Sequence, residues 1–465
     1  MTSVIPEEVL SIYKTLEKNG FEVYFVGGCV RNILLKKDVK DWDLTTNATP
    51  NKITKTFKNS FYDNEFGTVG IPIKIDEKEK VAEVTTFRTE KSYSPTHRPE
   101  KVSWGKIIEE DLSRRDFTIN AIALRLTSFA QGKPSVFELI DPYGGEKDLN
   151  KKLVKAVGNA NERFKEDALR LIRAVRIATE LGFKIEKETF KKIKEDASLI
   201  QHISKERIRT ELLRILSTKN AYDGIMLLKE CGLLHYIIPE LLEGVGVSQV
   251  RPGRHHTEDV FTHNVLSLKF CPSNDPIVKF AALLHDIGKP KVASKDKEGL
   301  VIFHNHEIAG AKIAQEICER LKFSKKEKER VVTLIRWHMF SVNENLTDAA
   351  IRRFIRRIGV DNVRDMMDLR VGDRLGGGTQ TAQSWRLKLF KKKIEEQLKP
   401  APFSINDLAI NGNDIMKELN IKPGPKVGKI LQKIFEEVDE DLSKNSKEWL
   451  IKRVGEIDKM DIKNL

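Results

Sequence analysis

The sequence predicts an α+β protein in which a small N-terminal β-sheet head with helices precedes an all-α remainder. Short runs of β-branched and aromatic residues, bounded by Gly, Asp or Lys, occur between residues 21 and about 140. From about residue 155 onward, apolar residues recur at helical spacing almost without interruption. The turn signal DPYGG at residues 141–145 separates the two patterns.

A chain of 465 residues is long enough for several hydrophobic cores, so we expect more than one domain. Breaks rich in Gly and Pro near residues 244–252 and 400–404 are candidate boundaries within the helical part. The expected domains are a head (1–150), a helical neck (151–245), a helical body (246–400) and a helical tail (401–465).

Composition indicates which kind of partner and which compartment to expect for the protein. Lys and Arg number 81 against 68 Asp and Glu, and the net charge of +13 favours a polyanionic partner. We expect a cytoplasmic protein without a membrane partner, because no basic, then apolar N-terminal leader and no run of about 18 apolar residues is present. The widely spaced cysteines form no CxxC pair and are expected to be reduced packing residues. They are Cys29, Cys231, Cys271 and Cys318.

Two aspartates in the segment DWDLT are the first candidate site. Asp41 and Asp43 lie two apart in a segment that reads as a strand, so both carboxylates should project from the same face. Such a pair can hold Mg²⁺, which nucleotidyl transfer needs to neutralise a triphosphate and to activate the attacking hydroxyl. A lone DxD is more often a strand end with solvated charges. Glu83 is either a third carboxylate near the metals or a solvated strand residue.

A glycine turn lies upstream of the two aspartates. Gly27 and Gly28 follow a predicted strand and open a predicted helix that contains Arg31, where backbone N–H groups and a guanidinium suit a phosphate. Together with DWD, this segment resembles the signature of the class II tRNA nucleotidyltransferase and bacterial poly(A) polymerase family. The segments RRDFTINA (114–121), DPYGG (141–145) and EDALR (166–170) resemble later motifs of that family, in the same order.

The resemblance implies a template-independent enzyme that adds CCA to the 3′ end of tRNA from CTP and ATP, with Mg²⁺ held by the two aspartates. It also implies that Asp167 and Arg170 hydrogen-bond to the Watson–Crick edge of the incoming base. The two residues are three apart in a segment expected to be helical, so they should share a face; in isolation they would be an ordinary ion pair. Arg173 and Arg176 should continue this basic ridge toward the triphosphate. Residues assigned to the nucleotide are Gly28, Arg31, Arg115, Asp167, Arg170, Arg173 and Arg176.

The head motifs leave neighbouring activities open, since a poly(A) polymerase and a CC-adding or A-adding enzyme share them. Residues 89–102 are polar and aperiodic, as expected of a mobile loop, and the family has a flexible loop here that is linked to the switch from C to A addition. Its presence favours full CCA addition. The chain departs from the family at Asn32, where Asp is usual, and at Asn159-Ala160, where Asp-Pro is frequent.

A second candidate site lies in the expected body. Residues of metal-ligand type occur there in the order H…HD…D, namely His263, His285, Asp286 and Asp373. Imidazoles and carboxylates suit a divalent transition metal or Mg²⁺, and a buried His-Asp pair that only packs would be costly. The pattern resembles the HD phosphohydrolase superfamily, in which His306 and His338 match further ligands of some members. The resemblance implies phosphatase or phosphodiesterase activity; the alternative is a structural metal site in helices that only grip RNA.

The tail resembles the C-terminal helical domain of the nucleotidyltransferase family, which implies that it holds the tRNA elbow. The basic runs KLFKKKI and IKPGPKVGK could contact phosphates, which positions RNA without reading its sequence. Each run is otherwise an ordinary solvated helix face. No protein partner can be inferred.

Overall fold

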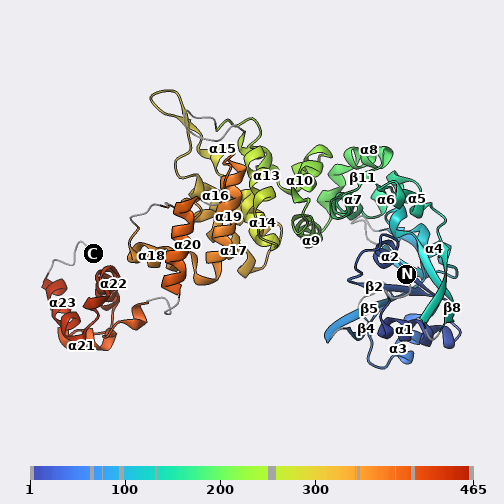
Figure 1. Ribbon diagram of the computed structural model, residues 1–465, viewed down its shortest axis with the longest axis horizontal. Helices are drawn as coiled ribbons and strands as arrows, with labels where there is room; N and C mark the ends of the chain where they lie inside the picture. Colours follow the sequence, from blue (N-terminus) through green and yellow to red (C-terminus); the bar gives the residue numbers. More distant parts are fainter. Residues whose placement is uncertain are drawn as a thin grey trace. The chain divides into compact units, whose positions relative to one another are not determined.

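The computed structural model describes residues 5–62, 67–75, 77–93, 99–130, 133–249, 258–340, 342, 346–382, 384–398 and 404–459. The chain forms two compact units. Unit 1 comprises Met1–Glu243 and Ile317–Ser324, and unit 2 comprises Gly244–Glu316 and Lys325–Leu465. The predicted α+β class is confirmed, because one large sheet lies at the N-terminus and helices dominate the rest (Figure 1). The division into four domains stays a prediction.

The head is built on a seven-stranded sheet with the spatial order β3-β4-β5-β2-β1-β8-β9. Strands β2 and β5 are parallel, whereas the other neighbouring pairs are antiparallel. The strands are β1 (Val23–Val26), β2 (Trp42–Thr46), β3 (Phe61–Tyr62), β4 (Thr68–Ile75), β5 (Lys78–Thr86), β8 (Ala123–Ala130) and β9 (Lys133–Ile140).

Aromatic packing fixes the central strands of this sheet. Helix α1 (Glu7–Lys18) presents Tyr13, whose ring stacks on Phe25 of β1 at a centroid distance of 5.4 Å. Phe25 in turn meets Trp42 of β2 edge-on at 5.8 Å. Strand β1 is buried along its whole length, which accounts for its continuous apolar sequence VYFV. These contacts hold β2, and with it the DWD segment, in the middle of the sheet.

The prediction of a loop at residues 89–102 is wrong for residues 89–93 and 99–102, which form strands, whereas the mobility of this segment stays a prediction. Strands β6 (Arg88–Tyr93) and β7 (Pro99–Trp104) form a two-stranded antiparallel sheet with register shifts near Ser92. Residues 94–98 of the expected loop lie outside the described residues. Backbone pairing between two polar segments leaves no hydrophobic alternation, so the sequence pattern did not indicate it.

The rest of unit 1 is almost entirely helical, with one short parallel pair, β10 (Leu153–Val154) and β11 (Lys184–Ile185). Its first helices are α2 (Gly28–Leu34), α3 (Pro50–Thr56), α4 (Ile108–Ser113) and α5 (Gly145–Asn150). The following helices are α6 (Ala160–Glu166), α7 (Leu169–Leu181), α8 (Lys187–Glu195), α9 (Lys205–Leu216), α10 (Ala221–Glu230), α11 (Leu234–Ile237) and α12 (Pro239–Leu242).

Unit 2 contains helices and one small hairpin, β12 (Ser294–Lys295) and β13 (Val301–Ile302). Its first helices are α13 (Val260–Phe270), α14 (Pro276–Leu284), α15 (Lys289–Val292), α16 (His306–Arg320), α17 (Lys325–Arg336) and α18 (Asp348–Ile358). The end of α16, from Ile317, belongs to unit 1. Helix α19 (Val363–Gly376), helix α20 (Trp385–Leu398) and the tail helices α21 (Gly412–Leu419), α22 (Pro425–Glu440) and α23 (Lys447–Lys459) follow.

Two glycines let α19 approach α13 closely. A Cβ atom at Gly372 would lie 2.5 Å from the carbonyl oxygen of Ser267, and one at Gly376 would lie 2.7 Å from the Ser267 nitrogen. Both distances are far below van der Waals contact, so only glycine fits at these positions. The close approach brings Asp373 of α19 to the side of His263 of α13.

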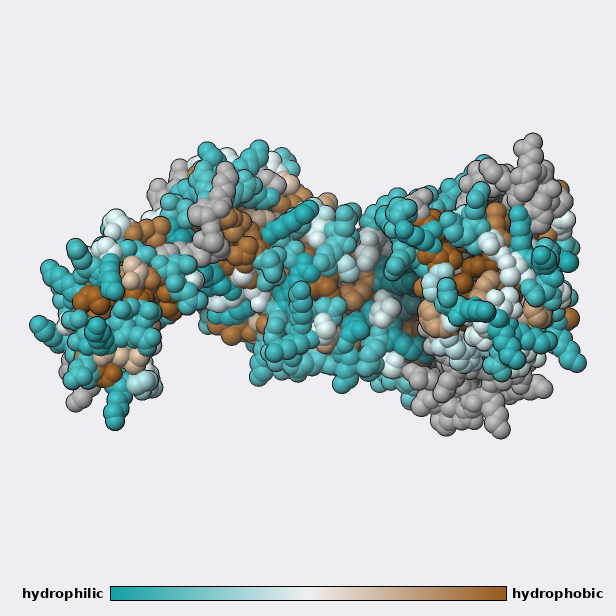
Figure 2. Space-filling view, turned by 90° about the horizontal axis from the view of Figure 1, so that it is seen from below, coloured by the Kyte–Doolittle hydropathy of each residue, from teal (hydrophilic) through white to brown (hydrophobic). Residues whose placement is uncertain are grey.

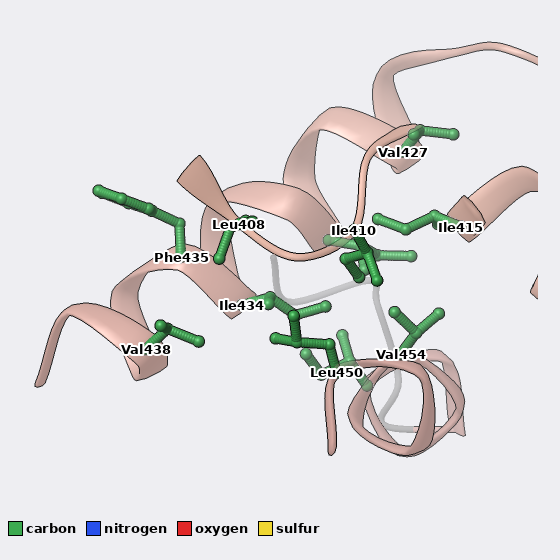
Figure 3. Close-up of a cluster of buried hydrophobic side chains, with 11 residues drawn as sticks. Leu408, Ile410, Ile415, Val427, Ile434, Phe435, Val438, Leu450 and Val454 are labelled. Carbon is green, nitrogen blue, oxygen red and sulfur yellow. The ribbon is translucent and has the colours of Figure 1, made fainter. Parts of the chain in front are cut away.

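The tail has an apolar cluster of its own, formed by α21, α22 and α23 (Figure 3). Ile415, Ile434 and Leu450, one from each helix, are fully buried within it. Helix α22 begins at Pro425 after Gly424, as the Lys-Pro-Gly-Pro turn predicts.

The drawn surface (Figure 2) is mostly hydrophilic, and the cysteines lie beneath the surface. The face drawn in Figure 2 is mostly hydrophilic, with scattered hydrophobic patches. Within the described ranges no helix is both long and apolar enough to span a membrane. All four cysteines are buried, which confirms the packing role expected for them.

Candidate functional site

The two aspartates of the DWD segment lie at the start of β2 in the head. Asp41 immediately precedes the strand and is exposed, whereas Asp43 lies within it and is partly buried. Trp42 between them is only 2% exposed and packs into the core. The two carboxylates therefore belong to the face opposite Trp42, as the alternation of a strand requires. Glu83 of β5 pairs directly with Asp43, and a pocket of about 450 Å³ is lined by both Asp41 and Glu83.

The glycine turn, Arg115 and Asp43 converge on one point. Gly27 has φ 71°, in the region that favours glycine, and it precedes α2. A Cβ atom at Gly27 would lie 3.0 Å from Arg115 Nη1 and 3.4 Å from Asp43 Oδ2. Burial raises the pKa of Asp43; the guanidinium of Arg115 opposes this rise and the carboxylate of Asp41 adds to it. Two carboxylates that repel one another beside a buried position are a donor set that a divalent cation would stabilise.

The side chain of Arg115 forms an ion pair with Asp111 of α4. Arg115 Nη2 donates to Asp111 Oδ2 at 2.9 Å, and Arg114 Nη2 donates to Asp111 Oδ1 at 2.5 Å. The Nε atom of Arg115 is buried and has no hydrogen-bond partner among the described residues. Arg31, the other predicted phosphate contact, is 8% exposed and donates from Nη1 to Asn120 Oδ1 at 2.8 Å. Burial lowers the pKa of Arg31.

Asp111 should make the stability of the head depend on pH in the acid range. Although burial opposes its charge, Arg114 and Arg115 lower the pKa of Asp111 to about 2. The unfolded value is about 3.9, so this stabilisation is complete above about pH 4 and is lost as the pH falls toward 2. We expect Asp111→Asn to lower the free energy of unfolding by roughly 2 kcal/mol at pH 7. The gap between variant and parent should close as the pH falls, in guanidinium titrations from pH 6 to 2.

The matched control for this titration is Glu109→Gln, because Glu109 is an exposed carboxylate of the same helix. It should leave the pH profile unchanged. A gap that stayed constant down to pH 2 for Asp111→Asn would contradict the assignment of the stability to this carboxylate.

Asp167 and Arg170, the predicted base-reading pair, do not share a helix as expected. The expected single helix is broken: α6 ends at Glu166, Asp167 is extended with φ −144° and ψ 101°, and α7 begins at Leu169. Asp167 and Arg170 therefore do not lie on one helix face. Asp167 Oδ2 accepts a hydrogen bond from Arg207 Nη2 at 2.9 Å, and Arg170 Nη1 donates to Glu166 Oε2 at 2.6 Å.

Arg173 and Arg176, which were expected to form a basic ridge, are also paired with carboxylates. Arg173 donates from Nε and Nη2 to Asp116 Oδ2 at 2.9 and 2.6 Å, and these bonds hold the pKa of the buried Asp116 well below its usual range. Arg176, 6% exposed, donates to Glu211 at 2.9 Å and to Glu180 at 2.7 Å. Their long-range carboxylate partners make both arginines part of a buried network, and their contact with a nucleotide stays a prediction.

In unit 2 the structure brings all six residues of metal-ligand type into one buried cluster. His263 comes from α13, His285 and Asp286 directly follow α14, His306 begins α16, His338 follows α17 and Asp373 comes from α19. Two overlapping groups could each hold a metal ion, His263–His285–Asp286 and Asp286–His306–His338.

Asp286 belongs to both groups, and its two oxygens face different histidines. Asp286 Oδ2 lies 3.2 Å from His263 Nε2 and 3.3 Å from His285 Nε2. Asp286 Oδ1 lies 3.2 Å from His306 Nε2 and 3.6 Å from His338 Nε2. Asp373 completes the first group, with Oδ1 3.4 Å from His263 Nε2.

The backbone fixes the orientation of three imidazoles. The Nδ1 atoms of His285, His306 and His338 contact the carbonyl oxygens of Ala282, Phe303 and Ile335 at 2.9, 2.8 and 2.7 Å. A carbonyl oxygen only accepts, so each Nδ1 carries a proton and each Nε2 is the ring atom that faces the cluster. Metal-binding histidines are usually held in this way.

The charges of the cluster favour a bound cation. Although burial opposes a charge on His285, Asp286 and Asp373 raise its pKa to about 10. The pKa values of both carboxylates are held well below the usual range despite their burial, mainly by Lys289 and His285 for Asp286 and by His263 and His285 for Asp373. Burial lowers the pKa of His338. Two carboxylates and four imidazole Nε2 atoms are donors that suit one or two divalent cations, and a bound cation would take the place of the Nε2 proton of His285.

Several residues at these sites were missed by the sequence analysis. Asp111, Asp116 and Glu211 are the carboxylates that hold Arg115, Arg173 and Arg176, and Arg207 holds Asp167. Only the spacing of Asp111 to Arg115, four residues along a helix, was a usable signal. The other pairs join residues 35 to 57 positions apart, which no local pattern indicates.

Three segments of the chain match known protein families. Residues 23–155 match the family described as "Poly A polymerase head domain", and residues 182–244 match "Probable RNA and SrmB- binding site of polymerase A". Residues 300–454 match a family described as tRNA nucleotidyltransferase domain 2.

Whole-chain comparisons point the same way. The chain is 32% identical over 457 residues to a CCA-adding enzyme of Limosilactobacillus reuteri, covering 97% of each chain. It is 34% identical over 342 residues to the A-adding tRNA nucleotidyltransferase of Deinococcus radiodurans, covering 71% of this chain and 75% of that one. The crystal structure of the Bacillus stearothermophilus CCA-adding enzyme in complex with CTP is similar over 99% of both chains, with 25% identity and a TM-score of 0.72.

Proposed function

The chain belongs to the family of tRNA nucleotidyltransferases that includes the CCA-adding enzymes, and we propose that it adds C, C and A in order to the 3′ end of tRNA from CTP and ATP. The observation that carries the proposal is the convergence of Gly27, Arg115 and Asp43 in the head, since it joins a close backbone approach, a guanidinium and a carboxylate. Similarity to the L. reuteri enzyme along nearly the whole chain supports CCA addition rather than a partial reaction.

In the proposed reaction the 3′ hydroxyl of tRNA attacks the α-phosphate in line and loses its proton to water. Its oxygen bonds to phosphorus, and the bond between the α-phosphorus and the bridging oxygen breaks as pyrophosphate leaves with the bond pair. Asp41 and Asp43 would hold Mg²⁺, which would neutralise charge on the triphosphate and lower the pKa of the attacking hydroxyl. Arg115, oriented by Asp111, donates to phosphate oxygens from the side of Gly27, where a larger residue would clash. Arg31 and Gly28 are proposed to contact the nucleotide beside it.

Incorporation of labelled CTP and ATP tests the assignment. Transfer RNAs ending before CCA, after C and after CC are supplied with CTP alone, ATP alone or both. We expect ordered addition of C, C and A that then stops. Long A tails would identify a poly(A) polymerase, and CC only or A only would identify a partial enzyme.

Base choice is proposed to depend on Asp167 and Arg170. Asp167 offers an acceptor, and Arg170 would offer donors to the base in exchange for its present bonds to Glu166 and to the Arg114 carbonyl oxygen. Together they can satisfy the Watson–Crick edge of C or A and leave groups unpaired with G or U. Asp167 lies on extended backbone rather than on a helix, and its carboxylate is oriented by Arg207 of α9.

Asp167→Ala should therefore lower discrimination between CTP and UTP by about 10-fold or more, because a removed hydrogen bond to a base edge is worth ~1.5 kcal/mol or more. Competition between labelled CTP and UTP on a tRNA ending before CCA measures the ratio. Glu162→Ala, which removes an exposed carboxylate of α6, is the matched control. Unchanged selection among the four nucleotides in the Asp167 variant would exclude the proposed role.

We also propose a second centre in unit 2, a metal-dependent phosphoester hydrolase of the HD type. The observation that carries it is the position of Asp286 between two pairs of histidines, with one carboxylate oxygen toward each pair. Asp286 and the histidines on either side of it would hold divalent ions, which would supply activation of water and stabilisation of charge on a phosphate. In hydrolysis the water oxygen bonds to phosphorus, the ester P–O bond breaks, and the alcohol leaves with a proton. Phosphate release, with metal content measured on the same sample, tests the proposal.

Three smaller assignments complete the proposal. Glu83 acts as a third carboxylate beside Asp41 and Asp43, since its strand position pairs with Asp43. The tail contacts the tRNA elbow through basic residues around α22. The protein works in the cytoplasm, which suits its four reduced cysteines.

A further inference from the structure

The cavity beside the buried histidine cluster contains a donor whose partner is missing. A cavity of about 350 Å³ is lined on one side by Asp286, His306 and His338, and Gln249 also lines it. Gln249 is only 4% exposed. Its Nε2 atom is buried and has no hydrogen-bond partner in the part of the chain that the structure describes. Leaving a buried amide N–H unpaired costs free energy, so this group points to a ligand in the cavity.

The orientation of the Gln249 amide is fixed by chemistry. Lys289 Nζ donates to Gln249 Oε1, and the same Nζ lies 2.5 Å from Asp286 Oδ2. An ammonium group has donors and no acceptor, so only the oxygen of the amide can face Lys289. The nitrogen must then be the free end. Asp286, Lys289 and Gln249 thus form a chain of polar contacts, which we call the relay. The relay begins at Asp286, the residue common to both groups of metal-ligand type, and ends at the N–H donor of Gln249.

The other polar groups of the cavity indicate which ligand this donor would meet. Arg370 lines the cavity and donates from Nη1 to Asp373 Oδ2 at 3.0 Å, which places a second cation beside the cluster. Phe303 and Met339 contribute apolar surface. An amide N–H, a guanidinium and an ammonium around a carboxylate–histidine cluster suit an anion with several oxygens and an organic substituent.

We infer that Gln249 is the residue that recognises the ligand in this cavity, by donating from Nε2 to a phosphoryl oxygen of a bound phosphoester. This inference rests on the metal centre proposed for unit 2. The relay couples the donor to that centre, because Asp286 anchors Lys289 and Lys289 sets the amide. Gln249 is thus a specificity residue for phosphoryl oxygens rather than a metal ligand.

The experiment measures binding of inorganic phosphate to the full-length protein loaded with Mn²⁺, by titration calorimetry. Gln249→Glu keeps the length of the side chain and an oxygen for Lys289 but replaces the free donor with an acceptor. It should weaken phosphate binding about 100-fold or more, and Gln249→Met about 10-fold. The melting temperature and the Mn²⁺ content should stay as in the parent protein. Gln380→Glu makes the same charge change at an exposed position and should have no effect.

The source of the phosphoryl group is read from displacement of bound phosphate. A nucleoside monophosphate and a tRNA ending in a 3′-phosphate are the two competitors, and displacement by either supports the inference and identifies the source. Displacement by neither contradicts it.

Failures of the inference and of the proposed centre are distinguishable. Unchanged phosphate affinity in an Mn²⁺-loaded Gln249→Glu protein would overturn the inference and leave the metal centre in place. A parent protein that takes up no Mn²⁺ would overturn the proposed centre, and the inference with it.

Discussion

Replacement of Asp43 by alanine is expected to reduce nucleotide incorporation about 10³-fold or more, equivalent to a rise of ~4 kcal/mol in the activation free energy. The substitution removes a carboxylate that the cation needs. It also removes the negative charge that faces Arg115 beside Gly27. Asp43 lies within the central strand β2, so no neighbouring carboxylate of that strand can take its place. Single-turnover addition of labelled ATP to a tRNA ending in CC measures the effect.

Asp38→Ala is the matched control, because Asp38 is an exposed aspartate a few residues before β2. It should retain parental activity. The Asp43 variant should still take up Mn²⁺ in unit 2, which separates loss of the head chemistry from loss of the fold. Incorporation by Asp43→Ala within about 10-fold of the parent would remove Asp43 from the reaction.

Local patterns predict where the residues of the proposed head site lie, because these residues are close together in the sequence. The glycine turn and the two aspartates each occupy a short segment, and alternation along a strand fixes which side chains share a face. Asp41 and Asp43 therefore needed no tertiary information. The partner of Arg115 in α4 lies only one helical turn away and was also within reach of such reasoning.

The neck shows where such reasoning fails. Apolar periodicity continues from α6 into α7 without a gap, so it cannot reveal that Asp167 is extended. The roles of Arg173 and Arg176 depend on Asp116 and Glu211, which come from other segments of the chain. A buried arginine and an exposed arginine look alike in a sequence, and only tertiary packing decides between a salt bridge and a free ridge.

For the body, the sequence predicts which residues are of metal-ligand type but does not predict how these residues are arranged. Spacing singled out the histidines and Asp286, because a His-Asp pair that ends an apolar helix is poorly explained by packing. It could not show that the two oxygens of Asp286 face different histidines. Gln249 carries no signal at all, since an isolated glutamine resembles any other until Lys289 is seen beside it.

Replacement of Asp286 by alanine should abolish metal uptake in unit 2 and reduce phosphoester hydrolysis about 10³-fold or more. Both groups of ligands contain this residue, so its loss leaves two histidines in the second group and no carboxylate between them. His306→Ala removes a ligand from the second group alone and should leave one ion per chain instead of two. Metal content by mass spectrometry and hydrolysis of bis(p-nitrophenyl) phosphate measure the two effects.

The exposed Glu298 provides a control, since Glu298→Ala removes a carboxylate of the same unit and should change neither quantity. Nucleotide incorporation should be unaffected by Asp286→Ala, because Asp41 and Asp43 belong to the other compact unit. If His306→Ala bound as much metal as the parent, Asp286 would serve a single ion, and the second group would be a buried histidine pair without a ligand role. If Asp286→Ala lost no metal, the six residues would be a packed polar core.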